Sequence, residues 1–260
     1  MAYRNLKRCR ALITGASSGI GRALAIELAR HNVDLILFAR REDRLAGVAE
    51  EVSRLGGRAV CTVGDVTNSD DRKRALAAAR DELGGLDILI NNAGVAAHGR
   101  FAESDPNRVW PIMDTNFFAP VALIREAIPL LRTGRHPIVV NIGSILGERA
   151  APHKSIYSAS KHALHGFTEA LRPEFARLGI DLLLVAPGPT QSEHFDTLLE
   201  DKGLPWPEPR RMPARNVAVQ IVRAIEVGRT FLVTGWRSRL WLLLDRLCPR
   251  FVDRLLRRYG

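Results

Sequence analysis

The sequence predicts an α/β fold, a doubly wound parallel sheet formed by one domain that spans residues 1–260. Short apolar runs alternate with longer segments of helical periodicity, which is the pattern of βαβ units. The runs are apolar throughout and do not alternate with polar residues, as expected for strands that helices cover on both faces. The chain has 260 residues, 46% of them hydrophobic, and this length suits a single domain of this class.

The apolar runs give the expected strands in order: 11–14, 33–39, 59–63, 88–90, 138–142 and 182–186. Helices are expected at 21–31, 41–55 and 70–83, because these segments have helix-forming composition and glycine pairs follow the last two. From 190 to 213 four prolines interrupt the pattern. An irregular segment of this length inside a compact domain predicts a substrate lid.

Cysteine content and hydropathy indicate a soluble, cytoplasmic protein. Cys9, Cys61 and Cys248 are widely spaced and form no CxxC pair, so neither a disulfide framework nor a metal site is expected. No apolar stretch approaches the ~18 residues of a membrane-spanning helix. A signal peptide is not expected either, because the N-terminal segment reaches a glycine-rich turn before any apolar run of sufficient length.

The net charge of +10 is concentrated in the C-terminal extension. Residues 229–260 contain eight Arg and two Asp, so 8 − 2 = +6 of that charge lies there. No nucleic-acid-binding motif accompanies it, and nucleic acid is not an expected partner. Within 235–260, Pro249 divides two basic amphipathic segments. Three placements of this tail remain open: peripheral contact with an anionic membrane, packing on a second subunit, or packing over the active-site mouth.

A glycine-rich turn follows the first strand and opens directly into a helix. It reads TGASSGIG from Thr14 to Gly21. Glycines allow a tight turn and close backbone approach, and the free N–H groups of a helix N-terminus attract a pyrophosphate. A dinucleotide site is therefore predicted, with contacts from Gly15, Ser17, Ser18, Gly19, Ile20 and Gly21.

The end of the second strand favours NADP(H) over NAD(H). An acidic residue at this place would accept hydrogen bonds from the ribose hydroxyls and repel a 2′-phosphate. Here Ala39 is followed by Arg40, whose guanidinium can pair with that phosphate. The alternative is that Arg40 and Arg41 only form the solvated start of a helix.

Tyr157 and Lys161 lie four residues apart at the start of a helical segment, which places both side chains on one helix face. A tyrosine with its reference pKa of about 10 is a poor base at neutral pH unless a nearby cation favours the phenolate. Lys161 can provide that cation. Tyr157 is therefore the candidate catalytic acid/base. The alternative is that Tyr157 is an exposed tyrosine beside a lysine, with no catalytic role.

Five motifs together resemble the short-chain dehydrogenase/reductase family over about residues 11–190. They are the TGASSGIG turn, the segment Asn91, Asn92, Ala93 and Gly94 after the fourth strand, Ser144 after the fifth, the YSASK segment at 157–161, and Pro187 with Gly188 after the sixth. The resemblance implies a single Rossmann-type domain with oxidoreductase activity. The chain departs from many relatives at Gly143, where they have a second Ser.

The resemblance implies a catalytic tetrad of Asn116, Ser144, Tyr157 and Lys161. Ser144 would bond the substrate oxygen, Tyr157 would transfer the proton, and Lys161 would hold the nicotinamide ribose and lower the pKa of Tyr157. Asn116 would position a water that connects Lys161 to solvent. The alternative for Asn116 is a helical residue that bonds locally.

The resemblance also implies further cofactor contacts. Asp65 and Val66 would face adenine, and Asn91, Ala93 and Gly94 would pack along the cofactor. For Asn91 a purely structural role at the strand end is the alternative. Tyr157 and Lys161 would contact the nicotinamide end, as would Pro187, Gly188 and Thr190.

The expected reaction is NADP(H)-dependent interconversion of a carbonyl and an alcohol, in a homodimer or homotetramer by resemblance. A hydrophobic substrate is favoured because the lid segment contains Phe195, Leu198, Leu199, Leu204, Pro205 and Trp206, although these residues could equally pack the lid onto its own domain. Two alternatives remain: an NAD(H)-preferring alcohol dehydrogenase, and a cofactor-binding sensor or membrane-associated scaffold without turnover.

Overall fold

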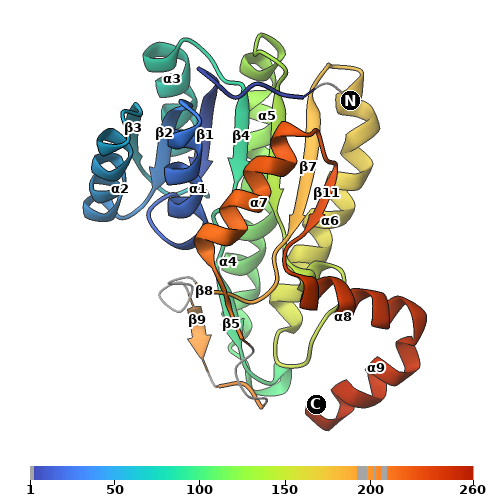
Figure 1. Ribbon diagram of the computed structural model, residues 1–260. Helices are drawn as coiled ribbons and strands as arrows, with labels where there is room; N and C mark the ends of the chain where they lie inside the picture. The colour runs from blue at the N-terminus through green and yellow to red at the C-terminus, as the bar shows by residue number, and fades with distance from the viewer. Residues whose placement is uncertain (1–2, 192–197, 202, 206–209, 260) are drawn as a thin grey trace.

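The computed structural model describes residues 3–191, 198–201, 203–205 and 210–259. Its centre is a seven-stranded sheet of order β11-β7-β6-β4-β1-β2-β3, in which every neighbouring pair is parallel (Figure 1). The strands are β1 Arg10–Thr14, β2 Asp34–Ala39, β3 Ala59–Val63, β4 Ile88–Asn91, β6 Ile138–Ile142, β7 Asp181–Ala186 and β11 Phe231–Val233. This confirms the predicted doubly wound α/β fold.

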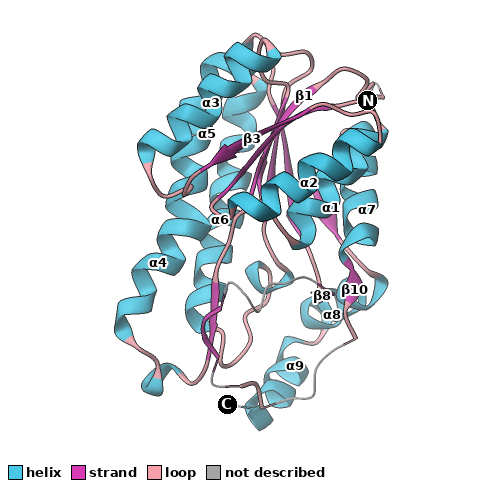
Figure 2. Ribbon diagram, turned by 90° about the vertical axis from the view of Figure 1, so that its left-hand side faces the viewer, coloured by secondary structure: helices cyan, strands magenta, loops and turns pink. Residues whose placement is uncertain are grey.

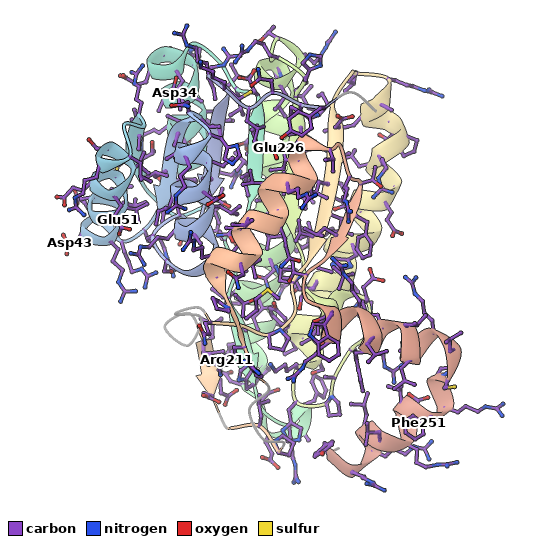
Figure 3. The ribbon with its side chains drawn as sticks, in the orientation of Figure 1. Asp34, Asp43, Glu51, Arg211, Glu226 and Phe251 are labelled. Atoms are coloured by element: carbon purple, nitrogen blue, oxygen red, sulfur yellow. The ribbon has the colours of Figure 1, made fainter. Side chains whose placement is uncertain are left out.

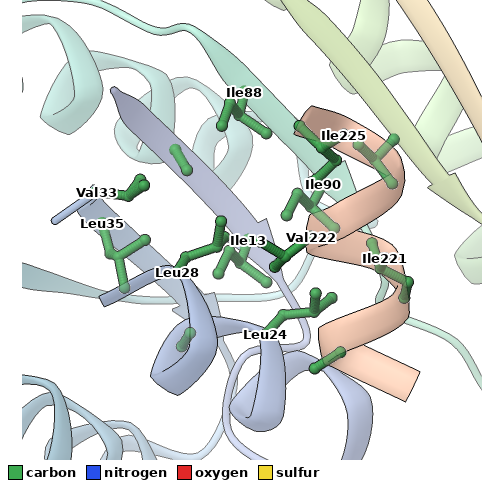
Figure 4. Close-up of a cluster of buried hydrophobic side chains, with 14 of the residues drawn as sticks. Ile13, Leu24, Leu28, Val33, Leu35, Ile88, Ile90, Ile221, Val222 and Ile225 are labelled. Carbon is green, nitrogen blue, oxygen red and sulfur yellow. The ribbon is translucent and has the colours of Figure 1, made fainter. Parts of the chain in front are cut away.

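Two sets of helices cover the two faces of the sheet, as the edge view in Figure 2 shows. One face carries α1 Gly19–Arg30, α2 Glu42–Arg54 and α7 Ala214–Glu226. The other carries α3 Ser69–Leu83, α5 Ala119–Arg132 and α6 Ser155–Ala176. On the first face, Leu24 of α1 and Val222 of α7 pack with Ile13 of β1 in a buried cluster (Figure 4).

The chain order of the strands determines where a ligand can bind. The chain runs outward from β1 through β2 to β3 and then returns to the other side of β1 to form β4. In an open parallel sheet, a crevice forms outside the carboxyl ends of the strands where the order reverses in this way. The glycine turn after β1 and the segment after β4 therefore meet at the same crevice.

The six predicted strands are all present, and each predicted boundary agrees within one residue. Further strands of two to four residues were not predicted. They are β5 Ala96–His98, β8 Thr190–Gln191, β9 Leu198–Asp201, β10 Met212–Pro213 and, at the edge of the main sheet, β11. Within the predicted lid, β9 pairs with β5 and β10 pairs with β8.

Shorter helical segments complete the described chain. Before α5 come α4 Val109–Met113 and a π-helical turn, Asp114–Phe118; the 3₁₀ turns are Phe101–Glu103, Pro106–Arg108, Ile145–Gly147 and Arg257–Tyr259. The tail forms α8 Trp236–Leu247 and α9 Pro249–Leu256, which lie beyond the carboxyl ends of the strands (Figure 1). The predicted break at Pro249 is confirmed, and no described helix is long and apolar enough to cross a membrane.

Candidate active site

A cavity of about 840 Å³ lies at the carboxyl ends of the strands. The glycine turn after β1 forms one end, and Ser144, Tyr157 and Lys161 line the other. The segment after β7 and the C-terminal tail close its sides. The structure thus brings most of the predicted site residues to one cavity.

The glycine turn has the backbone shape that a phosphate site requires. Gly15 and Gly19 have φ angles of +64° and +54°, in the left-handed region that favours glycine. A Cβ on Gly21 would lie 2.3 Å from the Gly15 carbonyl oxygen, so this position also needs glycine. Helix α1 begins at Gly19, and the side chain of Ser18 makes no capping hydrogen bond. The N–H groups of the first helical turn are therefore available to an anionic ligand.

The segment after β4 is attached to this turn by hydrogen bonds. Thr14 Oγ1 accepts from the backbone N–H groups of Asn92 and Ala93 at 2.9 and 3.0 Å. The side-chain amide of Asn92 donates to the Thr14 and Gly15 carbonyls at 2.9 and 3.2 Å. Asn92, Ala93 and Gly94 consequently form one wall of the cavity.

Asn91 and Gly21, which are predicted to contact the cofactor, are not among the residues that line the cavity. Asn91 is 3% exposed, and its side-chain amide donates to Asn141 Oδ1 at 2.8 Å within the sheet. This matches the structural alternative for Asn91. Asn92, the residue after β4, lines the cavity wall instead.

Two arginines lie at the glycine-turn end. The guanidinium of Arg41 donates to Ser17 Oγ at 3.1 Å and to Ser18 Oγ at 2.6 Å. Arg40 also lines the cavity, but its side chain is 64% exposed, and Arg40 Nη1 lies 3.5 Å from Asp65 Oδ2. The sequence prediction included Arg40 and left out Arg41, since the distance from the glycine turn does not tell how each of two consecutive arginines lies. Asp65 and Val66 line the cavity, as expected.

Tyr157 and Lys161 come from α6 and Ser144 from the segment after β6. Lys161 Nζ lies 5.8 Å from the centroid of the Tyr157 ring and donates to the Ile142 carbonyl at 2.9 Å. The Ser144 hydroxyl bonds the Tyr157 side chain and accepts from the Leu146 N–H at 3.1 Å. A hydroxyl donor, a phenol and an ammonium group therefore meet at one point of the cavity.

Burial shifts the pKa values of both Tyr157 and Lys161. It raises the pKa of Tyr157, and the hydrogen bond from Ser144 offsets only part of that shift. Burial also lowers the pKa of Lys161 to about 8. Tyr157 is thus a protonated phenol at neutral pH, which is the form that donates a proton.

Asn116 occupies the π-helical turn between α4 and α5 and is fully buried. Its Oδ1 accepts from the Val95 N–H, and its Nδ2 donates to the Val95 carbonyl and to Ser160 Oγ, each at 2.9 Å. A Cβ on Gly94 would lie 3.1 Å from Asn116 Oδ1 and 3.7 Å from Lys161 Nζ. Asn116 therefore lies behind the cavity wall, on the same side of Gly94 as Lys161.

The segment after β7 and the tail complete the cavity. Pro187, Gly188 and Thr190 line it, as expected. A Cβ on Gly188 would lie 2.0 Å from Ser238 Oγ, so α8 packs directly on this segment. Trp241 of α8 and Leu255 and Leu256 of α9 also face the cavity. Of the three placements considered for the tail, the structure shows the one over the active-site mouth.

Ion pairs attach the tail to the loop after Ser144. Arg149 pairs with Asp245 of α8 at 3.3 Å and with Asp253 of α9. From the lid segment, Leu204 and Arg211 line the cavity, and Arg211 is labelled in Figure 3. Phe195 and Trp206, which were expected to face a hydrophobic substrate, lie outside the described residues.

Known proteins are similar to this chain in sequence. The family model described as short chain dehydrogenase matches residues 10–203. The 11-beta-hydroxysteroid dehydrogenase-like 4A of Arabidopsis thaliana is 36% identical over 244 residues, which cover 93% of this chain and 81% of the relative. Ketoacyl reductase HetN of Nostoc is 30% identical over 260 residues, 96% of this chain and 88% of the relative.

Two solved structures have the same fold. A short-chain dehydrogenase/reductase from Burkholderia phymatum in complex with NAD has a TM-score of 0.85 at 24% identity, covering 95% of this chain and 96% of its own. A short chain dehydrogenase from Burkholderia cenocepacia in complex with NADP has a TM-score of 0.81 at 25% identity, covering 97% and 99%. The match to the family model and the identity to these relatives show that the chain belongs to the short-chain dehydrogenase/reductase family.

Proposed function

We propose that the protein is an NADP(H)-dependent oxidoreductase that interconverts a carbonyl and a primary or secondary alcohol on a hydrophobic substrate. The observation that carries this proposal is the single cavity with Ser144, Tyr157 and Lys161 at one end and the glycine turn with its arginines at the other. A dinucleotide placed between these ends would meet hydrogen-bond donors for its phosphates at one end and a proton donor for the substrate at the other.

The residues present fit a dinucleotide with a 2′-phosphate. The turn at Gly15 and Gly19 offers backbone N–H groups to the pyrophosphate. Arg41 stands beside Ser17 and Ser18 and can form charge-assisted hydrogen bonds to a phosphate, with Arg40 close by. The alternative is an NAD(H)-preferring dehydrogenase, in which Asp65 would hold Arg40 away from the nucleotide.

Side chains of this protein would supply the proton in the reaction. In reduction, Ser144 Oγ would donate a hydrogen bond to the carbonyl oxygen, and Tyr157 Oη would donate the proton that this oxygen gains. Lys161 in its charged form would hold the ribose hydroxyls and stabilise the phenolate left on Tyr157. Asn116 would keep the backbone around Val95 and the residues behind Lys161 in place. The bound nicotinamide supplies or accepts the hydride.

The cavity walls favour an apolar substrate. Beyond Tyr157 the walls include Ile145, Leu146, Leu204 and Trp241. Sites of this kind hold a ligand by apolar burial and orient it with few polar groups. The names of several relatives include hydroxysteroid dehydrogenase, which supports a substrate with a large apolar body and a secondary hydroxyl or ketone.

A turnover assay tests this function. NADPH and NADH are titrated first, and cofactor oxidation is then followed by absorbance with a panel of ketosteroids and of smaller hydrophobic ketones and aldehydes. We expect NADPH-dependent reduction of the larger apolar ketones. Equal or better catalytic efficiency with NADH would reject the NADP(H) preference, and tight NADPH binding without turnover on any substrate would favour the sensor or scaffold alternative.

Lys161 predicts the pH dependence of carbonyl reduction. Its pKa of about 8 means that the ammonium form is present below this pH and is lost as the pH rises through it. We expect kcat/KM for NADPH, which reports groups of the free enzyme, to fall above about pH 8. Lys161→Arg keeps its charge over this range, so its kcat/KM for NADPH should not fall above about pH 8. If kcat/KM falls at the same pH in both proteins, the fall does not come from Lys161.

The tail keeps an exposed apolar stripe on the side away from the cavity. Trp236, Leu240, Leu243 and Leu247 follow one another at helical spacing along α8 and are 51–70% exposed. Phe251 of α9 is 53% exposed (Figure 3). Arginines flank this stripe, and a basic amphipathic helix suits the surface of an anionic membrane. We therefore propose a cytoplasmic protein whose tail contacts membranes peripherally.

Vesicle binding tests the membrane contact. Replacing Leu240 and Leu247 by Glu should weaken binding to phosphatidylserine-containing vesicles at least about tenfold, because each buried leucine contributes about 1.5–3 kcal/mol. Val219→Glu, at an exposed position of α7, is the control. Absence of binding by the unmodified protein, or equal binding by all variants, would reject this role.

A homodimer or homotetramer is proposed from the family resemblance and from a second apolar surface. Phe101, Trp110 and Phe118 are 70%, 71% and 43% exposed, and the rings of Trp110 and Phe118 stack with centroids 6.3 Å apart. Such exposed aromatic groups are typical of interfaces. Light scattering coupled to gel filtration should give a mass of two or four chains, and a single chain would reject the proposal.

A further inference from the structure

His165 shares the helix face of the two proposed catalytic residues of α6. It lies four residues after Lys161 and eight after Tyr157, so the three side chains follow one another along the helix. Its side chain is 5% exposed. The proposed reaction gives His165 no task, although a buried imidazole next to a reaction site needs polar partners.

The ring of His165 fills the space behind the Ser144 loop. A Cβ on Gly143 would lie 2.1 Å from His165 Nε2, and a Cβ on Gly147 would lie 2.6 Å from the same atom. Both positions therefore need glycine as long as the imidazole is present. A side chain at position 143 would occupy the place of the ring.

Two hydrogen bonds orient the ring. The backbone N–H of Ser144 donates to His165 Nε2 at 3.4 Å, and His165 Nδ1 lies 2.9 Å from Glu148 Oε1. Since Nε2 accepts, the proton of the neutral ring is on Nδ1 and is donated to the carboxylate. This hydrogen bond holds the pKa of Glu148 below its usual value, so Glu148 stays an acceptor.

The contact with Ser144 completes the anchoring of its loop. The N–H groups of the neighbouring residues, Gly143 and Ile145, donate to the Val185 and Pro187 carbonyls at 2.7 and 3.0 Å. The N–H of Ser144 itself points to the imidazole of His165. The residues on either side of Ser144 are therefore bonded to the segment of β7, and the Ser144 amide is bonded to α6.

We propose that His165, oriented by Glu148, is a positioning residue that fixes the backbone of Ser144 and thereby the place of the Ser144 hydroxyl relative to the Tyr157 phenol. The inference rests on the proposed function, in which both hydroxyls must reach one substrate oxygen. A displacement of about 1 Å of a group of this kind can cost up to about 100-fold in rate. His165 itself touches neither substrate nor cofactor.

A double-mutant cycle with Ser144 tests the proposal. His165→Leu keeps an apolar side chain in the space but cannot accept from the Ser144 amide, whereas the amide of His165→Gln can both accept and donate. We expect His165→Leu to lower kcat about 5- to 10-fold with little change in the Kd for NADPH, and His165→Gln to restore most of it. In a Ser144→Ala background, His165→Leu should change kcat less than about twofold. His162→Leu, at an exposed position of the same helix, is the matched control.

Amide hydrogen exchange of residues 142–148 gives a readout that needs no turnover. It should be faster in His165→Leu and return toward the original rate in His165→Gln. Equal losses of kcat in the Ser144 and Ser144→Ala backgrounds would overturn the proposal, as would unchanged exchange in this segment. If the unmodified protein reduces no carbonyl, the proposed function fails by itself, and the exchange result still decides whether His165 holds the Ser144 backbone.

Discussion

Tyr157→Phe is expected to lower kcat for carbonyl reduction by about 10²- to 10⁴-fold, the range that general acid catalysis contributes. The variant loses only the phenolic hydroxyl. The ring stays in place, so the Kd for NADPH should change less than about threefold. Burial raises the pKa of Tyr157, which favours the protonated phenol that acts as the proton donor.

Steady-state kinetics with thermal unfolding measures this effect and separates it from instability. Tyr3→Phe removes a hydroxyl from a side chain that is 67% exposed and far from the cavity, and it serves as the matched control. Both variants should unfold at about the temperature of the unmodified protein. Retention of more than a tenth of the original kcat by Tyr157→Phe would mean that another group supplies the proton.

Arg41→Ala is expected to weaken NADPH binding by about 10- to 100-fold and to leave NADH binding nearly unchanged. A hydrogen bond between charged partners is worth about 1.5–3 kcal/mol, and the guanidinium of Arg41 is already held beside the glycine turn by Ser17 and Ser18. Isothermal titration with each nucleotide gives the ratio of the two affinities.

The neighbouring arginine gives the comparison. Arg40→Asp should shift the preference less than an equivalent change at Arg41, because Arg40 is more exposed and lies near Asp65. Arg54→Ala, at the exposed end of α2, should change neither affinity. If Arg41→Ala weakens the binding of NADPH and of NADH equally, then Arg41 stabilises the glycine turn and does not select the 2′-phosphate.

The main elements of the fold could be predicted from sequence because the buried parallel strands are continuous apolar runs. The strand Ile138–Ile142 was predicted to the residue, and Leu182–Ala186 differed by one. The edge strand β11 was not predicted from the sequence. Its register is set by pairing with β7, which is a tertiary contact.

The candidate site was predictable where a motif fixes both residue type and backbone shape. The glycine turn and the Tyr157 and Lys161 pair are of this kind, since turn geometry and helix spacing are local. The choices between Asn91 and Asn92, and between Arg40 and Arg41, depend on which way a side chain points at the end of a strand. The role proposed for His165 could not be predicted from the sequence, because its partners Gly143 and Glu148 lie far from it in sequence and meet it only in the folded chain.

The most direct test of the central claim is the transfer of deuterium to a ketone that the unmodified protein reduces, from NADPH that carries deuterium at both positions of C4 of the nicotinamide. If this cavity carries out hydride transfer, mass spectrometry should find one deuterium on the carbinol carbon of the product, and none with Tyr157→Phe over the same time. Binding of neither nucleotide, or reduction without deuterium transfer from the labelled cofactor, would contradict the account.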